Sequence, residues 1–152
     1  LKFQMELASK HNLPLNFPVR DTSSAAKDQS VFDDFWPIFD SYPGLRGVLH
    51  SFTDTQEQLQ SALKRGLYIG VNGIATFARR SEQLEMYRAI PLEKLLLETD
   101  APFLTPAPYR GTICEPYHVR TTADFLAQLR GETVEALAKA TTRNAQQLFN
   151  VS

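Results

Sequence analysis

Residues 95–102 read Leu95-Leu96-Leu97-Glu98-Thr99-Asp100-Ala101-Pro102, and this stretch decides the fold. Three consecutive leucines predict a strand that is buried on both faces, as the strands of parallel sheets are. An ionised side chain at the end of such a strand is costly unless it faces a cation, a basic partner or water. Active sites of barrels and doubly wound sheets are built at the carboxyl ends of their strands. The stretch therefore predicts a functional site at Asp100.

A second apolar run ends in the same way. It reads Gly47-Val48-Leu49-His50-Ser51-Phe52-Thr53, so a side chain that can bind a metal follows the strand. One imidazole nitrogen of His50 can ligate a divalent cation while a hydrogen-bond acceptor holds the other. The alternative is a histidine that is hydrogen-bonded only to the backbone. Two strand ends that carry His50 and Asp100 together indicate a metal-assisted hydrolase.

Asp100 is the expected catalytic residue as well as a metal ligand. A carboxylate in this position can bind a metal and accept a proton from a water molecule, which is the general-base role in hydrolysis. The alternative is that Asp100 caps the turn at Ala101-Pro102. Glu98 lies two residues earlier, so both carboxylates face the same side of the strand. They repel each other unless a cation or an arginine lies between them.

Three further residues are candidates for substrate binding. Arg20 can neutralise the two carboxylates or grip a substrate phosphate with its planar guanidinium group. Its alternative role is a structural ion pair with Glu98 or Asp21. In the proline-rich loop after the carboxylates, Arg110 can neutralise a phosphate and Tyr109 can stack on a base. The alternative is a rigid, solvated loop.

Helical and strand-like segments alternate along the chain, which predicts parallel βαβ units. Four strands cannot close an eight-stranded barrel, which takes about 250 residues. We therefore expect residues 1–152 to form one domain, the C-terminal half of a (β/α)₈ barrel. A half-barrel leaves two open sheet edges and an exposed apolar face, so it needs self-association or a missing N-terminal half to cover them. The expected helices are 1–11, 31–39, 55–65, 81–88, 117–129 and 133–151, and the expected strands are 13–19, 45–50, 67–71 and 92–97.

The composition is that of an ordinary globular α/β protein, with 43% hydrophobic and 22% charged residues. The net charge of −1 provides no basic field for nucleic acid, so binding of phosphate must be local. The single cysteine, Cys114, excludes an internal disulfide and fits a reducing compartment, so we expect a cytoplasmic protein. No apolar stretch approaches the ~20 residues of a membrane span. The chain begins at Leu1 inside a helical pattern, so we expect it to be the later part of a longer protein.

Four motifs resemble the TatD family of metal-dependent deoxyribonucleases: Val48–Thr53, Leu96–Pro102, Pro108–Gly111 with Glu115-Pro116, and Thr141–Ala145 with Leu148-Phe149. They occur in the order and spacing of the family over nearly the whole chain. The resemblance implies a (β/α)₈ barrel, a divalent metal centre and hydrolysis of phosphodiesters, in DNA or in a small phosphodiester. It also implies that His50 is a metal ligand and that Asp100 binds the metal and the water. The metal remains open between magnesium, manganese, zinc and nickel.

The chain also departs from the family pattern. The family has a His-x-His pair on its first strand and a glutamate on a middle strand, and neither region is present. A family histidine precedes an Arg-Asp pair, and here Pro18 stands in its place before Arg20 and Asp21. A hydrolytic metal site needs three or more protein ligands. Two alternatives therefore stay open: a barrel that acts on amides or lactones, and a non-catalytic remnant with an incomplete site.

Overall fold

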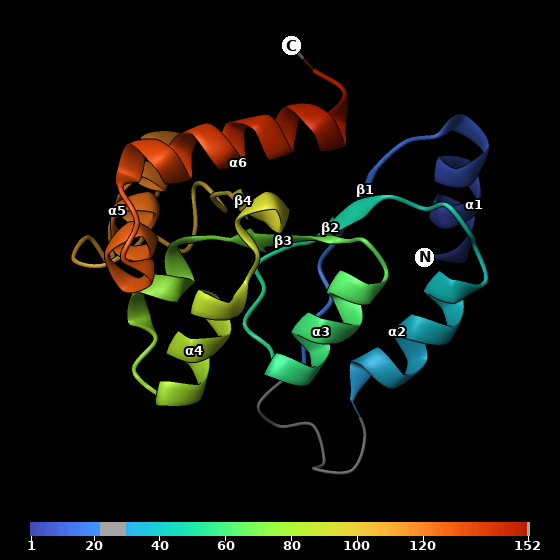
Figure 1. The fold of residues 1–152 in the computed structure, drawn as a ribbon, viewed down its shortest axis with the longest axis horizontal. Coiled ribbons are helices and arrows are strands. Elements are labelled where there is room, and N and C mark those ends of the chain that lie inside the picture. The colour runs from blue at the N-terminus through green and yellow to red at the C-terminus, as the bar shows by residue number, and fades with distance from the viewer. Residues whose placement is uncertain (22–29, 152) are drawn as a thin grey trace.

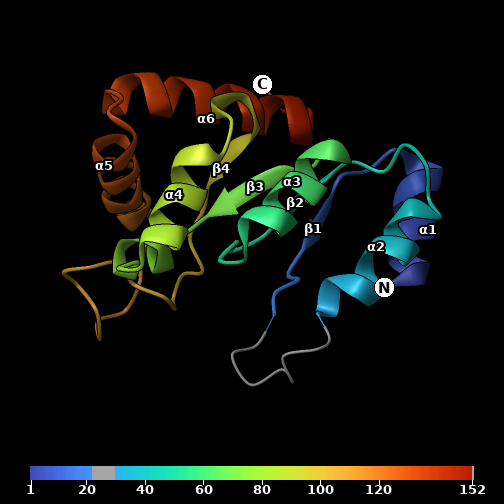
Figure 2. The same ribbon diagram turned by 60° about the horizontal axis from the view of Figure 1, so that its bottom comes forward.

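Four short parallel strands form the centre of the fold, in a computed structural model that describes residues 1–21 and 30–151. The strands pair in the order β1-β2-β3-β4, which is also their order in the sequence. This is the sheet expected for half of a (β/α)₈ barrel, and Figures 1 and 2 show it with its helices. The strands are β1 (Leu15–Phe17), β2 (Gly47–Leu49), β3 (Tyr68–Val71) and β4 (Leu95–Leu97).

Within the described residues, six α-helices and three 3₁₀ turns pack around the sheet. Figure 1 shows α6 on the other side of the sheet from α3 and α4. The helices are α1 (Lys2–His11), α2 (Val31–Asp40), α3 (Gln56–Lys64), α4 (Ser81–Ala89), α5 (Val119–Arg130) and α6 (Val134–Phe149). The 3₁₀ turns are η1 (Gly73–Phe77), η2 (Leu92–Lys94) and η3 (Pro116–His118). No helix in the described ranges is both long enough and apolar enough to cross a bilayer.

The structure corrects the bounds of two predicted strands. Strand β4 begins at Leu95 instead of at residue 92, because Leu92–Lys94 form the turn η2. Strand β1 spans only Leu15–Phe17 instead of residues 13–19, because the prolines on either side have no N–H to donate to the sheet. Helix α2 runs from Val31 to Asp40 with Pro37 inside it. Pro37 lies on its exposed face, whereas Phe35 and Phe39 on the buried face contact Phe17 with ring centroids 5.3 and 5.7 Å apart. Burial of this aromatic face stabilises the helix despite the proline.

The two faces of the sheet have different roles. One face packs on the helices and forms the main apolar core. On the other face, Val48 and Leu96 are buried against Leu148 of α6. Side chains two residues apart on a strand share a face. His50 and Glu98 follow Val48 and Leu96 at this spacing, so the predicted site lies on the same face as α6. Helix α6 covers this face only where the strands begin, and the site lies where they end.

A buried amide on α6 anchors this helix to the sheet. Asn144 is 1% exposed, and its Nδ2 donates to the carbonyl oxygens of Leu92 and Leu95, both at 2.8 Å. Asn144→Ala leaves both carbonyls without this partner, so we expect it to lower the free energy of unfolding by about 2–3 kcal/mol. Urea denaturation measures the loss, with Gln147→Ala on the exposed part of α6 as the control. Equal stability of the two variants would contradict this role.

The described sheet has two open edges, because β1 and β4 each pair on one side only. Beside β4, a groove of 630 Å³ between α5 and α6 is lined largely by apolar side chains, among them Leu97, Val119 and Val134. Open strand edges and apolar grooves of this kind favour association. We expect the isolated chain to form dimers or larger assemblies in size-exclusion chromatography with light scattering. A monomer that unfolds cooperatively would contradict this expectation.

Candidate metal centre

The parallel strands carry their polar residues to one edge of the sheet. His50 follows β2, Asn72 follows β3, and Glu98 and Asp100 follow β4. Because parallel strands end at the same edge, these four side chains from three strands converge. Figure 2 shows this edge, where the chain leaves β1 and where the loop between β4 and α5 lies.

His50 lies between the two carboxylates. Its Nδ1 is 2.9 Å from Oε2 of Glu98, and its Nε2 is 3.1 Å from Oδ1 of Asp100. The three side chains offer one ligand atom each, within 4.8 Å of one another. The two carboxyl groups thus lie on either side of one imidazole. Two negative charges this close repel each other, and a cation or a proton between them reduces the repulsion.

The imidazole of His50 has a carboxylate close to each of its two ring nitrogens. Its buried Nδ1 has no hydrogen bond of acceptable geometry, although Oε2 of Glu98 is close. Glu98 raises the pKa of His50 above 6.5, and burial of the ring opposes this effect only in part. A metal ion at this nitrogen-and-oxygen cluster therefore competes with a proton, so its affinity must fall as the pH is lowered through the pKa of His50.

Glu98 is fixed by the backbone around it. Its Oε1 accepts a hydrogen bond of 2.5 Å from the N–H of Ser51. Gly70 makes room for the carboxylate, since a Cβ at this position would lie 2.5 Å from Oε2 of Glu98. The carboxylate is thus locked beside Nδ1 of His50. Because a carboxylate in this position orients a metal-binding imidazole and increases its basicity, Glu98 supports His50 whether or not it binds the metal itself.

Asn72 is a site residue that the sequence analysis missed. It is 2% exposed, and its Nδ2 donates to Oδ1 of Asp100 at 3.0 Å and to Oγ of Ser51 at 2.8 Å. Its own Oδ1 accepts from the N–H of Ile74. The amide therefore fixes the orientation of the Asp100 carboxylate. A polar residue directly after β3, at the same edge as His50, was the signal that could have found it.

Arg20 lies in the same pocket as the predicted ligands. A pocket of 260 Å³ is lined by Pro18, Arg20, His50, Ser51, Asp100 and Leu104. The carboxylate of Asp21 accepts from Ser30 and Val31 at the beginning of α2, so it serves as a helix cap. Arg20 is exposed and lines this pocket together with one carboxylate, that of Asp100, and its role in binding phosphate stays a prediction.

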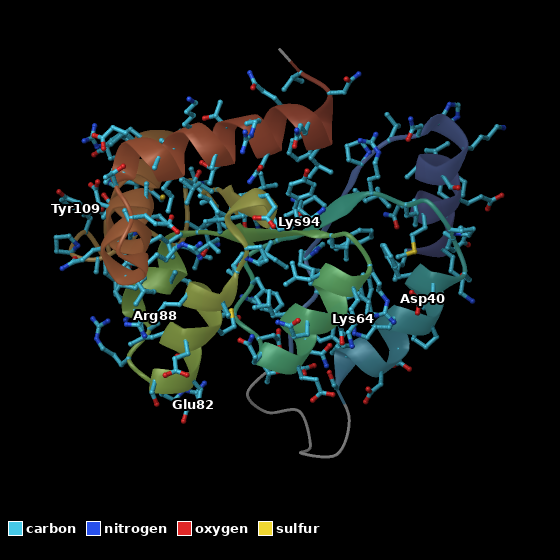
Figure 3. All side chains as sticks on the ribbon, viewed as in Figure 1. Asp40, Lys64, Glu82, Arg88, Lys94 and Tyr109 are labelled. Atoms are coloured by element: carbon cyan, nitrogen blue, oxygen red, sulfur yellow. The ribbon has the colours of Figure 1, made fainter. Side chains whose placement is uncertain are left out.

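The structure separates Tyr109 from Arg110, the two loop candidates. Arg110 lies over the ring of Phe77, with its guanidinium carbon 5.2 Å from the centroid. Tyr109 packs on the buried His118 with ring centroids 5.4 Å apart. Figure 3 shows Tyr109 at the outer edge of the molecule. Neither residue lines the pocket that contains His50 and Asp100.

A further carboxyl group near this edge has a shifted pKa. Burial raises the pKa of Asp54 to about 6, and the nearby Asp21 carboxylate acts in the same direction, whereas a hydrogen bond from the N–H of Asp21 opposes it. In the unfolded chain the value is 3.8. The folded state therefore binds the proton more tightly, and its stability decreases as the pH rises from about 4 to 6.

We expect Asp54→Asn to remove this pH dependence. The amide keeps an acceptor for the N–H of Asp21 and has no charge to bury. At pH 7.5 the variant should be more stable than the parent by about 1 kcal/mol, less than the whole pKa shift implies because the group is partly solvated. At pH 4 the two proteins should be equally stable. Thermal unfolding across this range measures the difference, and parallel curves would contradict the assignment.

A parallel α/β sheet with a His/Glu/Asp cluster at its carboxyl edge defines the class of barrel-type metal-dependent hydrolases. The sequence model of the family described as TatD related DNase matches residues 1–150. The chain belongs to this family.

Individual relatives agree with this assignment. The chain is 46% identical over 106 residues to the uncharacterized metal-dependent hydrolase YcfH of Escherichia coli K12, an alignment that covers 69% of the chain and 40% of the relative. It is 36% identical over 154 residues to the 3'-5' ssDNA/RNA exonuclease TatD of Citrobacter rodentium, covering 98% of the chain and 56% of the relative. The chain thus spans about half the length of the curated relatives it matches.

A solved structure shows the same arrangement. The chain matches the crystal structure of YjjV, a TatD homolog from Escherichia coli K12, with a TM-score of 0.81 and 29% sequence identity. The match covers 98% of the chain and 54% of that structure. This agreement confirms the predicted α/β fold of the barrel type.

Proposed function

We propose that this chain contributes the His50–Asp100 part of the metal centre to a phosphodiesterase of the TatD deoxyribonuclease type. The observation that carries the proposal is the convergence of His50, Glu98 and Asp100 from β2 and β4, the two strands on either side of β3. Arg20 lines the pocket that contains His50 and Asp100. This supports a phosphate-containing substrate, because a guanidinium group matches phosphate oxygens in geometry and charge.

The residues present fit a divalent cation. Nε2 of His50 lies 3.1 Å from Oδ1 of Asp100, and Glu98 lies beside Nδ1, so two carboxylates flank the ring. Such a mixed nitrogen and oxygen donor set suits zinc, manganese or nickel, and the carboxylates also suit magnesium. When bound, the cation supplies Lewis-acid polarisation and lowers the pKa of water.

The chain's own residues have separate roles in this proposal. Asn72 holds Oδ1 of Asp100, so the carboxylate has a fixed direction in which to accept a proton from the attacking water. Glu98, which the N–H of Ser51 holds in place, orients the imidazole of His50 as a ligand. Arg20 binds the phosphate of DNA or of a small phosphodiester.

One observation favours a second candidate, a non-catalytic remnant. Pro18 lines the pocket beside His50 and Asp100, and proline has no side-chain donor for a metal. Without a donor at position 18, the described residues offer at most three ligands, from His50, Glu98 and Asp100, which is the minimum for a hydrolytic site. Amide and lactone substrates, which the same type of site can hydrolyse, have no structural observation in their favour.

The test combines metal analysis with a substrate panel. The purified chain is equilibrated with Mn²⁺, Zn²⁺, Ni²⁺ or Mg²⁺, and bound metal is counted after dialysis. The loaded chain is then assayed on single-stranded DNA, bis(p-nitrophenyl) phosphate, an amide and a lactone. Stoichiometric metal with cleavage of the two phosphodiesters supports the proposal. Metal-dependent cleavage of the amide or lactone alone would contradict the proposed phosphodiester substrate. Failure to retain any metal would support the second candidate, the non-catalytic remnant.

A further inference from the structure

A second pocket adjoins the metal centre. It has a volume of 500 Å³, and Leu104 lines both this pocket and the one that contains His50 and Asp100. Its other walls come from η1, through Ile74 and Phe77, and from the loop after β4, through Phe103 and Arg110. Pockets of this size with mostly apolar walls and a few polar groups are typical of sites for small organic groups.

The walls of this pocket offer flat surfaces. Phe103 is 71% exposed, so most of its ring is open to a ligand. Arg110 lies over the ring of Phe77 at 5.2 Å, and its own planar group is exposed. Exposed aromatic rings and guanidinium planes are the surfaces on which unpaired nucleobases stack.

The backbone of this pocket is hydrogen-bonded to the backbone of Asp100, the candidate catalytic residue. The N–H of Phe103 donates to the backbone oxygen of Asp100 at 2.7 Å, and the two residues form an isolated antiparallel bridge. Leu104, the next residue, lines both pockets, so a group that stacks on Phe103 lies beside the pocket that contains Asp100. This is the relation required between a base and the phosphate of its own nucleotide.

The loop that forms the pocket is held in one shape. Oγ1 of Thr76 accepts from the N–H of Ala107 at 2.9 Å, and Oγ1 of Thr105 donates to the carbonyl of Thr112 at 2.6 Å. The loop lies so close to η1 that a Cβ on Gly73 would come within 2.5 Å of the carbonyl oxygen of Leu104. Leu104 itself has a φ of +57°, a conformation that costs energy for a bulky residue and is common at ligand sites. A pocket held in this way loses little conformational freedom on binding.

We propose that this pocket binds an unpaired nucleobase of the nucleotide whose phosphate lies at the metal centre. Phe103 provides the stacking surface, and Arg110 closes the pocket from the side of Phe77. The proposal rests on the phosphodiesterase function proposed above. A base inside a duplex is stacked and paired on its own strand, so the pocket selects single-stranded or frayed ends.

The test compares two single-stranded hexanucleotides by isothermal titration calorimetry in Mn²⁺. One is hexadeoxyadenylate with phosphorothioate linkages, and the other has the same linkages but lacks all bases. The full chain should bind the adenylate about tenfold more tightly than the abasic strand, the gain expected for one stacked base. Phe103→Ala should abolish this preference and leave the dissociation constant of the abasic strand unchanged. Phe103→Tyr, which keeps the ring, should preserve it.

The control is Ile113→Ala, because Ile113 is 73% exposed in the same loop but does not line the pocket. It should retain the preference for the adenylate. Equal binding of the two strands by the parent chain, an unchanged preference in Phe103→Ala, or a lost preference in Ile113→Ala would overturn the base pocket and leave the phosphodiesterase proposal intact. If neither strand binds, both proposals fail.

Discussion

Asp100→Asn is expected to lower metal-dependent hydrolysis by about 10²- to 10⁴-fold, the range for loss of a general base. The substitution keeps the size of the side chain and an oxygen that can accept the hydrogen bond from Asn72. It removes the negative charge that attracts the cation and the basicity that accepts a proton. The carboxylate is only half-buried, so the substitution leaves the core intact. The loss of activity then reflects the role of Asp100 in metal binding and proton transfer and not a loss of the fold.

Two measurements separate the causes of this loss. Calorimetric titration with Mn²⁺ or Zn²⁺ gives the affinity for the metal without reference to turnover, and it should fall at least tenfold, since one charged ligand of few is removed. Urea denaturation checks that the fold is retained. The matched control is Asp124→Asn, an exposed carboxylate on α5 away from the pocket, which should leave both affinity and activity unchanged. Undiminished activity of Asp100→Asn would remove Asp100 from the mechanism.

The sequence predicted the sheet because its strands have a strong local signal. The run Leu95–Leu97 is apolar throughout, and the structure makes it a strand of the parallel sheet with Leu95 and Leu96 buried. The alternation of such runs with helices then leaves few topologies for a parallel sheet. The convergence of His50 with Asp100 followed from the same reasoning, because both stand directly after strands that end at one edge.

The remaining features of the site depend on contacts that no local pattern contains. Asn72 reads as a turn residue before a glycine, and its role appears only when β3 lies between β2 and β4. Tyr109 and Arg110 are adjacent in the sequence, yet the loop directs them to His118 and to Phe77 respectively. Loop geometry is set by several weak turn preferences and by long-range packing, so it could not be predicted at this level of detail.

Pro18→His is expected to tighten binding of Zn²⁺ or Mn²⁺ by about tenfold or more, because it adds a ligand to a site that has few. Pro18 follows the last residue of β1, Phe17, and lines the pocket that contains His50 and Asp100. An imidazole placed there can reach the cation from a third strand. Proline fixes its own φ at a value that histidine also adopts, so the backbone can remain as it is.

Calorimetric titration in the presence of a competing chelator measures this gain, and Pro43→His, an exposed position before β2 and outside the pocket, is the control for a surface imidazole. The double variant Pro18→His, Asp100→Asn adds a second check. If the new imidazole shares a cation with Asp100, the gain in affinity must change when the carboxylate charge is removed, because ligands of one ion are not additive. An equal gain with and without the charge of Asp100 would place the two side chains on different ions, and the proposed centre would then be wrong.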